Sequence, residues 1–175
     1  MEWMFMPLKR YAEFSGRSRR KEYWMWTLFQ VLLYVGVLML MMVVGGGAIM
    51  TGGDPSAVAA AGGAAMIILA LYGLAALAFL IPGIAVTIRR LHDTGRSGWW
   101  LGGLFGLYIL LFLVTGMALT SGDPEGGGML SMILSLVIFA YAIAMLVFML
   151  LDGTKGPNKY GPDPKGGVDA DKVFA

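Results

Sequence analysis

The sequence has no cysteine, a single histidine and few charged residues. Only 14% of its 175 residues are charged, whereas a soluble domain of this length carries about a quarter. Without cysteine there are no disulfides, thiolate metal sites or cysteine nucleophiles, and one histidine cannot form a standard structural zinc site. With 58% hydrophobic residues, the chain has too little polar surface to cover a soluble globule. A lipid bilayer is the solvent that fits this composition.

Charge is also absent from four long hydrophobic runs. A helix crosses a hydrocarbon core of about 30 Å with roughly 20 apolar residues, and each run is long enough. None of the runs contains Asp, Glu, Lys, Arg or His. They predict transmembrane helices over Trp24–Val44, Ala64–Ile88, Trp99–Leu119 and Met129–Leu151. We therefore expect an all-α membrane protein in which residues 24–151 form a bundle of four transmembrane helices.

The positions of the basic residues predict the orientation. Of the 13 Lys and Arg residues, six precede the first run, three lie between the second and third, and four follow the fourth. The other two connections, 45–63 and 120–128, contain none and are expected to be flexible, Gly-rich turns. Because Lys and Arg are enriched on the cytoplasmic side, both termini are expected there (N-in, C-in). Residues 1–23 then form a basic cytoplasmic or interfacial arm, and residues 152–175 form a cytoplasmic tail.

A cleaved signal peptide is an alternative reading of the first run, because a basic segment precedes it. The apolar run, however, exceeds the usual hydrophobic region of about 7–15 residues. Cleavage would also leave an odd number of spans and spoil the segregation of basic residues. We favour an uncleaved helix.

Three polar motifs lie in the segments expected in the cytoplasm. They read Gly-Arg-Ser-Arg-Arg-Lys-Glu-Tyr-Trp at 16–24, Arg-Arg-Leu-His-Asp at 89–93 with Ser-Gly-Trp-Trp at 97–100, and Gly-Pro-Asn-Lys-Tyr-Gly at 156–161. Together they resemble the domain-of-unknown-function 805 family, small bacterial inner-membrane proteins without an established biochemical activity. The resemblance covers roughly residues 14–164. It implies a multi-pass protein of the bacterial inner (cytoplasmic) membrane and little more.

The cations of these motifs are candidates for an anion site. If the helix ends bring them together, their side chains would bind a phosphate or a lipid headgroup, and neighbouring polar groups would fix their geometry. The alternative is that these cations only orient the helices and face the negative end of the second helix dipole. The candidate ligand-binding residues are Arg17, Arg20, Arg89, Arg90, His92 and Arg96, supported by Glu22, Asp93, Asn158 and Tyr160.

No catalytic arrangement is evident. His92 and Asp93 are adjacent, and neighbouring side chains on a helix point about 100° apart, so they do not face each other as an acid–base pair. Residues 156–161 lack the Gly-x-x-x-x-Gly-Lys-Ser/Thr spacing of a phosphate-binding loop. No catalytic residue, metal or cofactor is therefore expected.

The second run is rich in small residues and contains one proline. Small residues let helices approach closely in lipid, so we expect this helix at the centre of the bundle, with close packing of neighbouring helices at Gly73. Pro82 is expected to kink this helix and to leave a carbonyl near Ala78 without its helical donor.

These features predict a non-catalytic membrane protein, namely a scaffold, an assembly factor or an accessory subunit. The alternative is a module that binds anionic lipid or a phosphate ligand at the cytoplasmic face. A transporter ranks last, because the four runs contain no Asp, Glu, Lys, Arg or His for ion coupling. Expected partners are membrane lipids, anionic ones among them, and another membrane protein or a second copy of the chain; no nucleic acid is expected.

Overall fold

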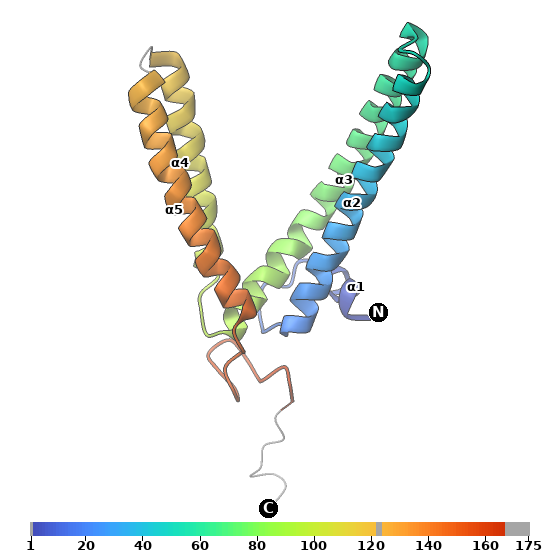
Figure 1. Ribbon diagram of the computed structural model, residues 1–175. Coiled ribbons are helices and arrows are strands. Elements are labelled where there is room, and N and C mark those ends of the chain that lie inside the picture. The colour runs from blue at the N-terminus through green and yellow to red at the C-terminus, as the bar shows by residue number, and fades with distance from the viewer. Residues whose placement is uncertain (1, 122–123, 167–175) are drawn as a thin grey trace, which may run out of the picture. The chain divides into compact units, whose positions relative to one another are not determined.

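The computed structural model describes residues 2–121 and 124–166, and these residues form five helices and no β-sheet. The prediction of an all-α chain with four helices that are long and apolar enough to cross a membrane is confirmed for this part of the chain. The helices are α1 (Glu2–Lys9), α2 (Arg20–Met50), α3 (Pro55–Asp93), α4 (Trp99–Ser121) and α5 (Pro124–Leu150), labelled in Figure 1.

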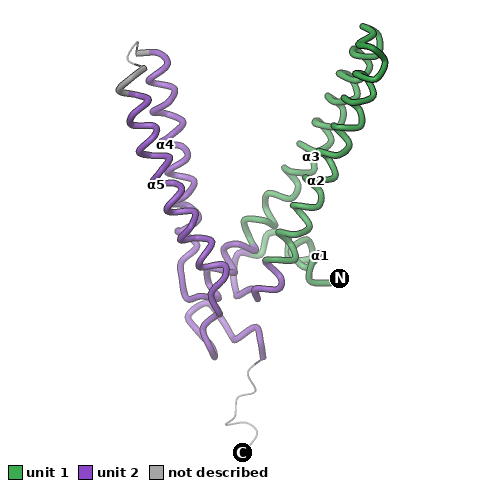
Figure 2. The backbone as a smooth tube through the Cα atoms, viewed as in Figure 1, with its two compact units in different colours: residues 1–13, 24–85 green, residues 14–23, 86–175 purple. Residues whose placement is uncertain are grey.

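The chain divides into two compact units, coloured separately in Figure 2. Unit 1 comprises residues 1–13 and 24–85, which include α1 and the hairpin of α2 with α3. Unit 2 comprises residues 14–23 and 86–175, which include the hairpin of α4 with α5. The packing of the two hairpins into one bundle and the N-in, C-in orientation stay predictions.

The turn between α2 and α3 is shorter than the sequence suggested. Residues 45–63 were expected to be a flexible connection, but all except 51–54 are helical. Alanine is the strongest helix former, and the run Ala59–Ala61 lies in this segment, so helix propensity prevails over the glycines around it. The turn itself is made where Gly52 and Gly53 adopt positive φ angles of 72° and 75°. The other expected turn, 120–128, is also largely helical, and its residues 122–123 lie outside the described part.

Aromatic rings join the three helices of unit 1. Trp26 of α2 is 3% exposed, and its ring packs edge-on against Phe79 of α3 with centroids 5.8 Å apart. Phe29 contacts both of these rings at 5.5 Å, and Phe5 of α1 packs edge-on against Phe29 at the same distance. This cluster fixes α1 and the first turns of α2 against the second half of α3.

Pro82 removes one hydrogen-bond donor from α3, and a side chain of the N-terminal arm takes its place. Proline has no N–H, so the carbonyl of Ala78, four residues earlier, has no helical donor. The Tyr11 hydroxyl donates to this carbonyl oxygen at 2.7 Å. The carbonyl that the sequence led us to expect near Ala78 is therefore satisfied by the arm.

The contact between α2 and α3 is made away from Gly73, and the packing expected of Gly73 in the four-helix bundle stays a prediction. Within unit 1, no atom lies within 4 Å of a β-carbon built on Gly73, because the α2–α3 contact is made by the aromatic rings around Phe79. Close contacts through glycine occur instead between α4 and α5. A β-carbon at Gly103 would lie 2.7 Å from the hydroxyl of Tyr141, and one at Gly127 would overlap Ala118.

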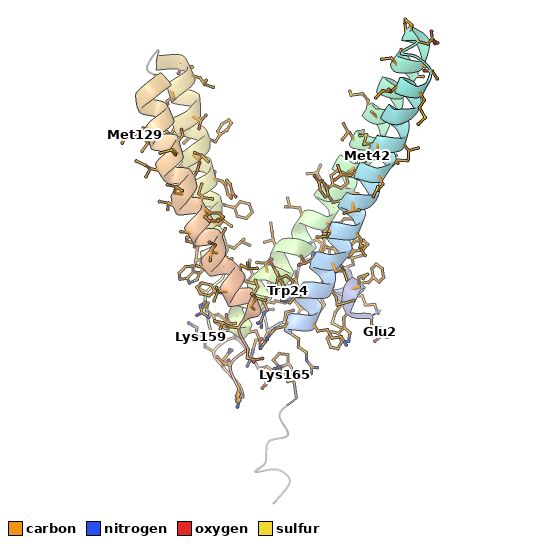
Figure 3. The ribbon with its side chains drawn as sticks, viewed as in Figure 1. Glu2, Trp24, Met42, Met129, Lys159 and Lys165 are labelled. Carbon is orange, nitrogen blue, oxygen red and sulfur yellow. The ribbon has the colours of Figure 1, made fainter. Side chains whose placement is uncertain are left out.

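The outer surfaces of both hairpins are apolar. Side chains project outward along the helices in Figure 3, and the most hydrophobic windows of α2, α3 and α4 contain no residue buried within the chain. Lipid tails are the solvent that such surfaces require.

Tyr11→Phe removes the donor to Ala78 and keeps the ring. We expect the free energy of unfolding in detergent to fall by about 0.5–1.5 kcal/mol, the net contribution of one hydrogen bond. In a Pro82→Ala background the amide of residue 82 supplies the helical donor, so the same change should cost clearly less. Thermal unfolding measures both effects when the unaltered protein, Tyr11→Phe, Pro82→Ala and the double variant are compared. An equal cost in the two backgrounds would show that Tyr11 does not compensate for Pro82.

Candidate functional site

Six polar residues are buried in unit 2, and we call them the polar core. They come from the segment that leads into α2 and from the last turns of α3, where the sequence has two of its three polar motifs. A buried charge is costly unless it is paired, so the partners of these groups decide what the site does. The polar core consists of Arg17, Ser18, Glu22, Arg89, Arg90 and Asp93, each no more than 5% exposed.

Arg17 is bonded through all three of its guanidinium nitrogens. Nε donates to Asp93 Oδ1 at 3.0 Å, Nη1 to the carbonyl of Gly156 at 2.6 Å and Nη2 to the carbonyl of Thr154 at 2.5 Å. The two carbonyls belong to the chain that follows α5. Arg17 thus joins the segment before α2 to the end of α3 and to the C-terminal tail.

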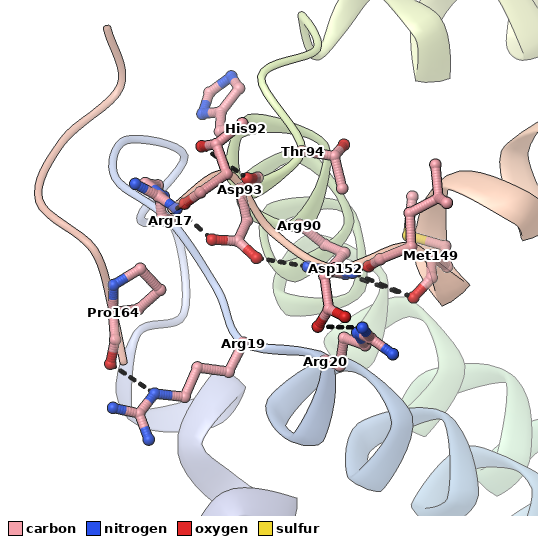
Figure 4. A network of polar contacts seen from close by, with 12 residues as sticks. Arg17, Arg19, Arg20, Arg90, His92, Asp93, Thr94, Met149, Asp152 and Pro164 are labelled. Carbon is pink, nitrogen blue, oxygen red and sulfur yellow. Dashed lines mark hydrogen bonds and ion pairs between the residues drawn. The ribbon is translucent and has the colours of Figure 1, made fainter. Parts of the chain in front are cut away.

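Arg90 is also bonded through all three of its guanidinium nitrogens, and it contacts the second carboxylate oxygen of Asp93. Nη1 donates to Asp93 Oδ2 at 2.5 Å, Nη2 donates to the carbonyl of Leu151, and both Nε and Nη2 reach the carbonyl of Met149 at 3.4 and 3.3 Å. The last carbonyls of a helix lack intrahelical donors, and they carry the negative end of its dipole. Arg90 supplies both the donors and the positive charge to the end of α5 (Figure 4).

A third pair joins α3 to the first turn of α2. Arg89 Nη2 lies 3.0 Å from Glu22 Oε1, with side-chain exposures of 0% and 3%. The amide of Ser18 also donates to the carbonyl of Arg89 at 3.1 Å. Glu22 stands in the first turn of α2, where the helix dipole favours a negative charge.

The tail docks against the end of α3 mainly through its backbone. The amide of Thr154 donates to the carbonyl of Asp93 at 2.8 Å, and Asn158 Nδ2 donates to the carbonyl of His92 at 3.0 Å. A β-carbon at Gly153 would overlap the carboxylate of Asp93. Only glycine allows the chain to pass this close.

His92 is held by stacking and not by an acid. Its ring is parallel to that of Tyr160, with centroids 3.9 Å apart and an interplanar angle of 4°, and Nδ1 lies 3.2 Å from the carbonyl oxygen of Gly16. The carboxylate of Asp93 faces Arg17 and Arg90 instead, as the adjacent positions of His92 and Asp93 predict.

The two remaining candidate arginines lie nearer the surface. Arg20 pairs with Asp152, which also accepts from Lys165 Nζ at 3.2 Å; the hydrogen bonds from Lys165 and then Arg20 lower the pKa of the Asp152 carboxyl. Arg96 places its guanidinium carbon 3.8 Å from the centroid of the Phe148 ring. The arginines predicted to form one site thus divide into three that are buried and two that are accessible.

Sequence reasoning missed the acceptors in the chain after α5. Met149, Leu151, Thr154 and Gly156 contribute backbone carbonyls, which every residue has, so no side chain marks them in the sequence. Asp163 was also missed. It accepts from the amides of Lys165 at 2.9 Å and Gly156 at 3.1 Å, and the hydrogen bond from Lys165 is the largest cause that lowers the pKa of its carboxyl.

The described residues contain no group of three or more His, Asp or Glu side chains that would hold a metal ion. The fold and the polar core define a class of integral membrane protein: apolar helical hairpins together with a buried arginine–carboxylate core.

The chain belongs to the family described as "Protein of unknown function (DUF805)", whose model matches residues 11–162. It is 32% identical over 169 residues to the inner membrane protein YhaI of Escherichia coli K12, which covers 95% of this chain and 98% of the relative. It is 34% identical over 165 residues to the inner membrane protein YhaH of the same strain, covering 94% and 98%. No solved structure matches the chain. With its four membrane-capable helices, the chain is a multi-pass protein of the bacterial inner membrane.

Gly153→Ala places a methyl group against the carboxylate of Asp93. We expect it to lower the free energy of unfolding by about 1–3 kcal/mol, the usual cost of inserting a group into a packed site. Gly106→Ala is the matched control, because nothing lies within 4 Å of a β-carbon there and alanine is the better helix former. Thermal unfolding in the same detergent compares the two variants. Equal stability for both would show that the tail does not pack on Asp93.

Proposed function

We propose that this protein is a non-catalytic scaffold, assembly factor or accessory subunit of the inner membrane. The observation that carries the proposal is the use of the buried guanidinium groups. Every nitrogen of Arg17 and Arg90 donates to Asp93 or to a backbone carbonyl of the same chain. These arginines are 5% and 0% exposed, so a soluble anion reaches them only after the tail is displaced. The polar core is better suited to hold a shape than to bind and turn over a substrate.

The choice of arginine supports a structural role. Lysine would satisfy the preference for positive charge on the cytoplasmic side, but it offers one compact ammonium group. Arg17 and Arg90 each donate to three acceptors. A planar guanidinium fits this geometry, and the ammonium of lysine on its flexible stem does not. Orientation alone therefore does not account for these residues.

We also propose that the polar core lies on the cytoplasmic side, with both termini in the cytoplasm. All 13 Lys and Arg residues lie before α2's apolar part, between the last turns of α3 and the start of α4, or after α5. The turn between α2 and α3 contains none. The tail then presents a fixed surface to a cytoplasmic or membrane partner.

A second candidate function is the binding of an anionic headgroup or a phosphate ligand at the same face. It is favoured by two cations that have no carboxylate partner among the residues described. Arg96 lies over Phe148, and Lys159 Nζ lies 4.9 Å from the centroid of the Tyr160 ring. Trp99, 84% exposed, begins α4 three residues after Arg96, as a ring at the level of lipid headgroups would.

Co-purification from native membranes separates the two candidates. An affinity tag placed after Ala175 should be cut by protease in inverted vesicles and protected in right-side-out vesicles, which checks the orientation. Mild solubilisation followed by mass spectrometry of proteins and lipids then identifies what is retained. We expect a protein partner in fixed stoichiometry, because the hydrogen bonds of Arg17 hold the tail in one position, which a protein surface can match.

The matched variant for this experiment is the double change Arg96→Gln with Lys159→Gln, which leaves the polar core intact. The scaffold proposal predicts that the protein partner is retained by this variant. Retention of an anionic lipid without any protein, and its loss in the double variant, would instead overturn the scaffold proposal in favour of headgroup binding.

A further inference from the structure

Two neighbouring residues of the polar core have buried polar atoms that no group in the described part of the chain satisfies. The atoms are Oγ of Ser18 and Nε and Nη1 of Arg89, and both residues are 0% exposed. The third guanidinium nitrogen of Arg89, Nη2, is paired with Glu22 at 3.0 Å. A buried donor that lacks an acceptor is costly, so a group of such donors points to a partner that the chain itself does not supply.

These atoms gather beside the start of α2, within unit 2. The amide of Ser18 donates to the carbonyl of Arg89 at 3.1 Å, which holds the two backbones side by side. The side chain of Arg89 extends from there to Glu22, four residues after Ser18 in the first turn of α2. The first amides of a helix lack intrahelical acceptors and carry the positive end of its dipole. A negative charge is therefore favoured at the same place.

The chemistry of the three atoms requires an acceptor. The N–H groups of a guanidinium only donate, and a serine hydroxyl is able to donate. A ligand that satisfies Ser18 and Arg89 together therefore has to accept at least two hydrogen bonds. Both a water molecule and an anion meet this requirement, so the charge of the surroundings decides between them.

The polar core has more positive than negative groups. It contains three guanidinium groups and two carboxylates, which leaves one positive charge. The carbonyls at the end of α5 and in the tail stabilise Arg17 and Arg90, but a carbonyl is a dipole and carries no net charge. An uncompensated charge in a buried site is costly. One monovalent anion cancels it, whereas a water molecule does not.

Burial limits the size of the anion. Ser18 and Arg89 are fully buried, and Glu22 is 2% exposed, so these side chains leave no passage to the surface. A lipid headgroup stays attached to its glycerol and acyl chains, which would have to leave the site through such a passage. A small inorganic ion can be enclosed completely.

We propose that the polar core holds one small monovalent inorganic anion of the chloride class. The hydroxyl of Ser18 and the Nε and Nη1 groups of Arg89 bind it beside the start of α2. The ion is a resident part of the fold that completes the charge balance of the buried arginines. This inference is independent of the function proposed above, because a scaffold built on Arg17, Arg90 and Asp93 is possible with or without the ion.

Thermal unfolding of the unaltered protein in detergent tests for the ion. Chloride is raised from zero at constant ionic strength by replacing gluconate, so that screening of surface charges stays the same. A ligand that binds the folded state raises the midpoint of unfolding as its concentration passes the dissociation constant. We expect the midpoint to rise in this way with chloride and with bromide, and not with gluconate, which is too large to be enclosed.

Two variants of Ser18 locate the effect. Ser18→Ala removes one donor and should weaken the apparent affinity for chloride several-fold, while Ser15→Ala is the matched control because Ser15 is exposed and should leave it unchanged. Ser18→Asp attaches a carboxylate where the anion lies, so its midpoint should no longer respond to chloride.

Diffraction from crystals grown in bromide gives a second, independent readout that needs no variant. We expect an anomalous peak for bromine beside Ser18 and Arg89.

Three results would overturn the proposal. The first is an equal midpoint in chloride and gluconate without an anomalous peak at Ser18, which would assign the space to water. The second is a chloride response that Ser18→Ala and Ser18→Asp both retain in full, because the ion would then bind elsewhere. The third is stabilisation by phosphate and not by chloride, which would assign the site to a phosphate ligand.

Discussion

The carboxylate of Asp93 is the group on which the polar core depends. One oxygen accepts from Arg17 and the other from Arg90, so a single acid is shared by two buried cations and offsets part of their charge. An unpaired buried charge is among the most destabilising features that a fold can contain. The remaining positive charge meets the carbonyls at the end of α5 and in the tail, which supply the negative end of a helix dipole and fixed backbone dipoles. The positive charge of the polar core is thus compensated by the carbonyls at helix ends as well as by carboxylates.

This arrangement explains why a short tail is part of the fold. Four segments end at the polar core, namely the entry to α2, the exit from α3, the exit from α5 and the tail, and each contributes groups that another one needs. Gly153 is where the tail passes closest to Asp93, and the stacked pair of His92 and Tyr160 covers the neighbouring turn. The motifs that looked separate in the sequence are therefore parts of one interaction network.

The sequence predicted the features that depend on composition and on residue type. Four uncharged runs predicted the four long helices, the short arginine-rich motifs marked Arg17, Arg89 and Arg90 as candidate site residues, and Pro82 predicted a carbonyl without its helical donor. It named Glu22 and Asp93 as supporting groups, and these carboxylates do pair with the three arginines. It did not predict the carbonyl partners, because backbone carbonyls have no signature in the sequence. It also missed the helical extension of residues 45–63, where alanine outweighs glycine.

The central claim is that Asp93 holds the tail onto the end of α3, and hydrogen–deuterium exchange of residues 153–161 tests it most directly. The comparison is between the unaltered protein and Asp93→Asn, which keeps the shape of the side chain and removes its charge. Asp152→Asn is the control, because Asp152 forms only a surface pair and is 71% exposed. The account predicts slow exchange at Thr154 and its neighbours in the unaltered protein and in the control, and fast exchange in Asp93→Asn. Equal protection in all three proteins would contradict it.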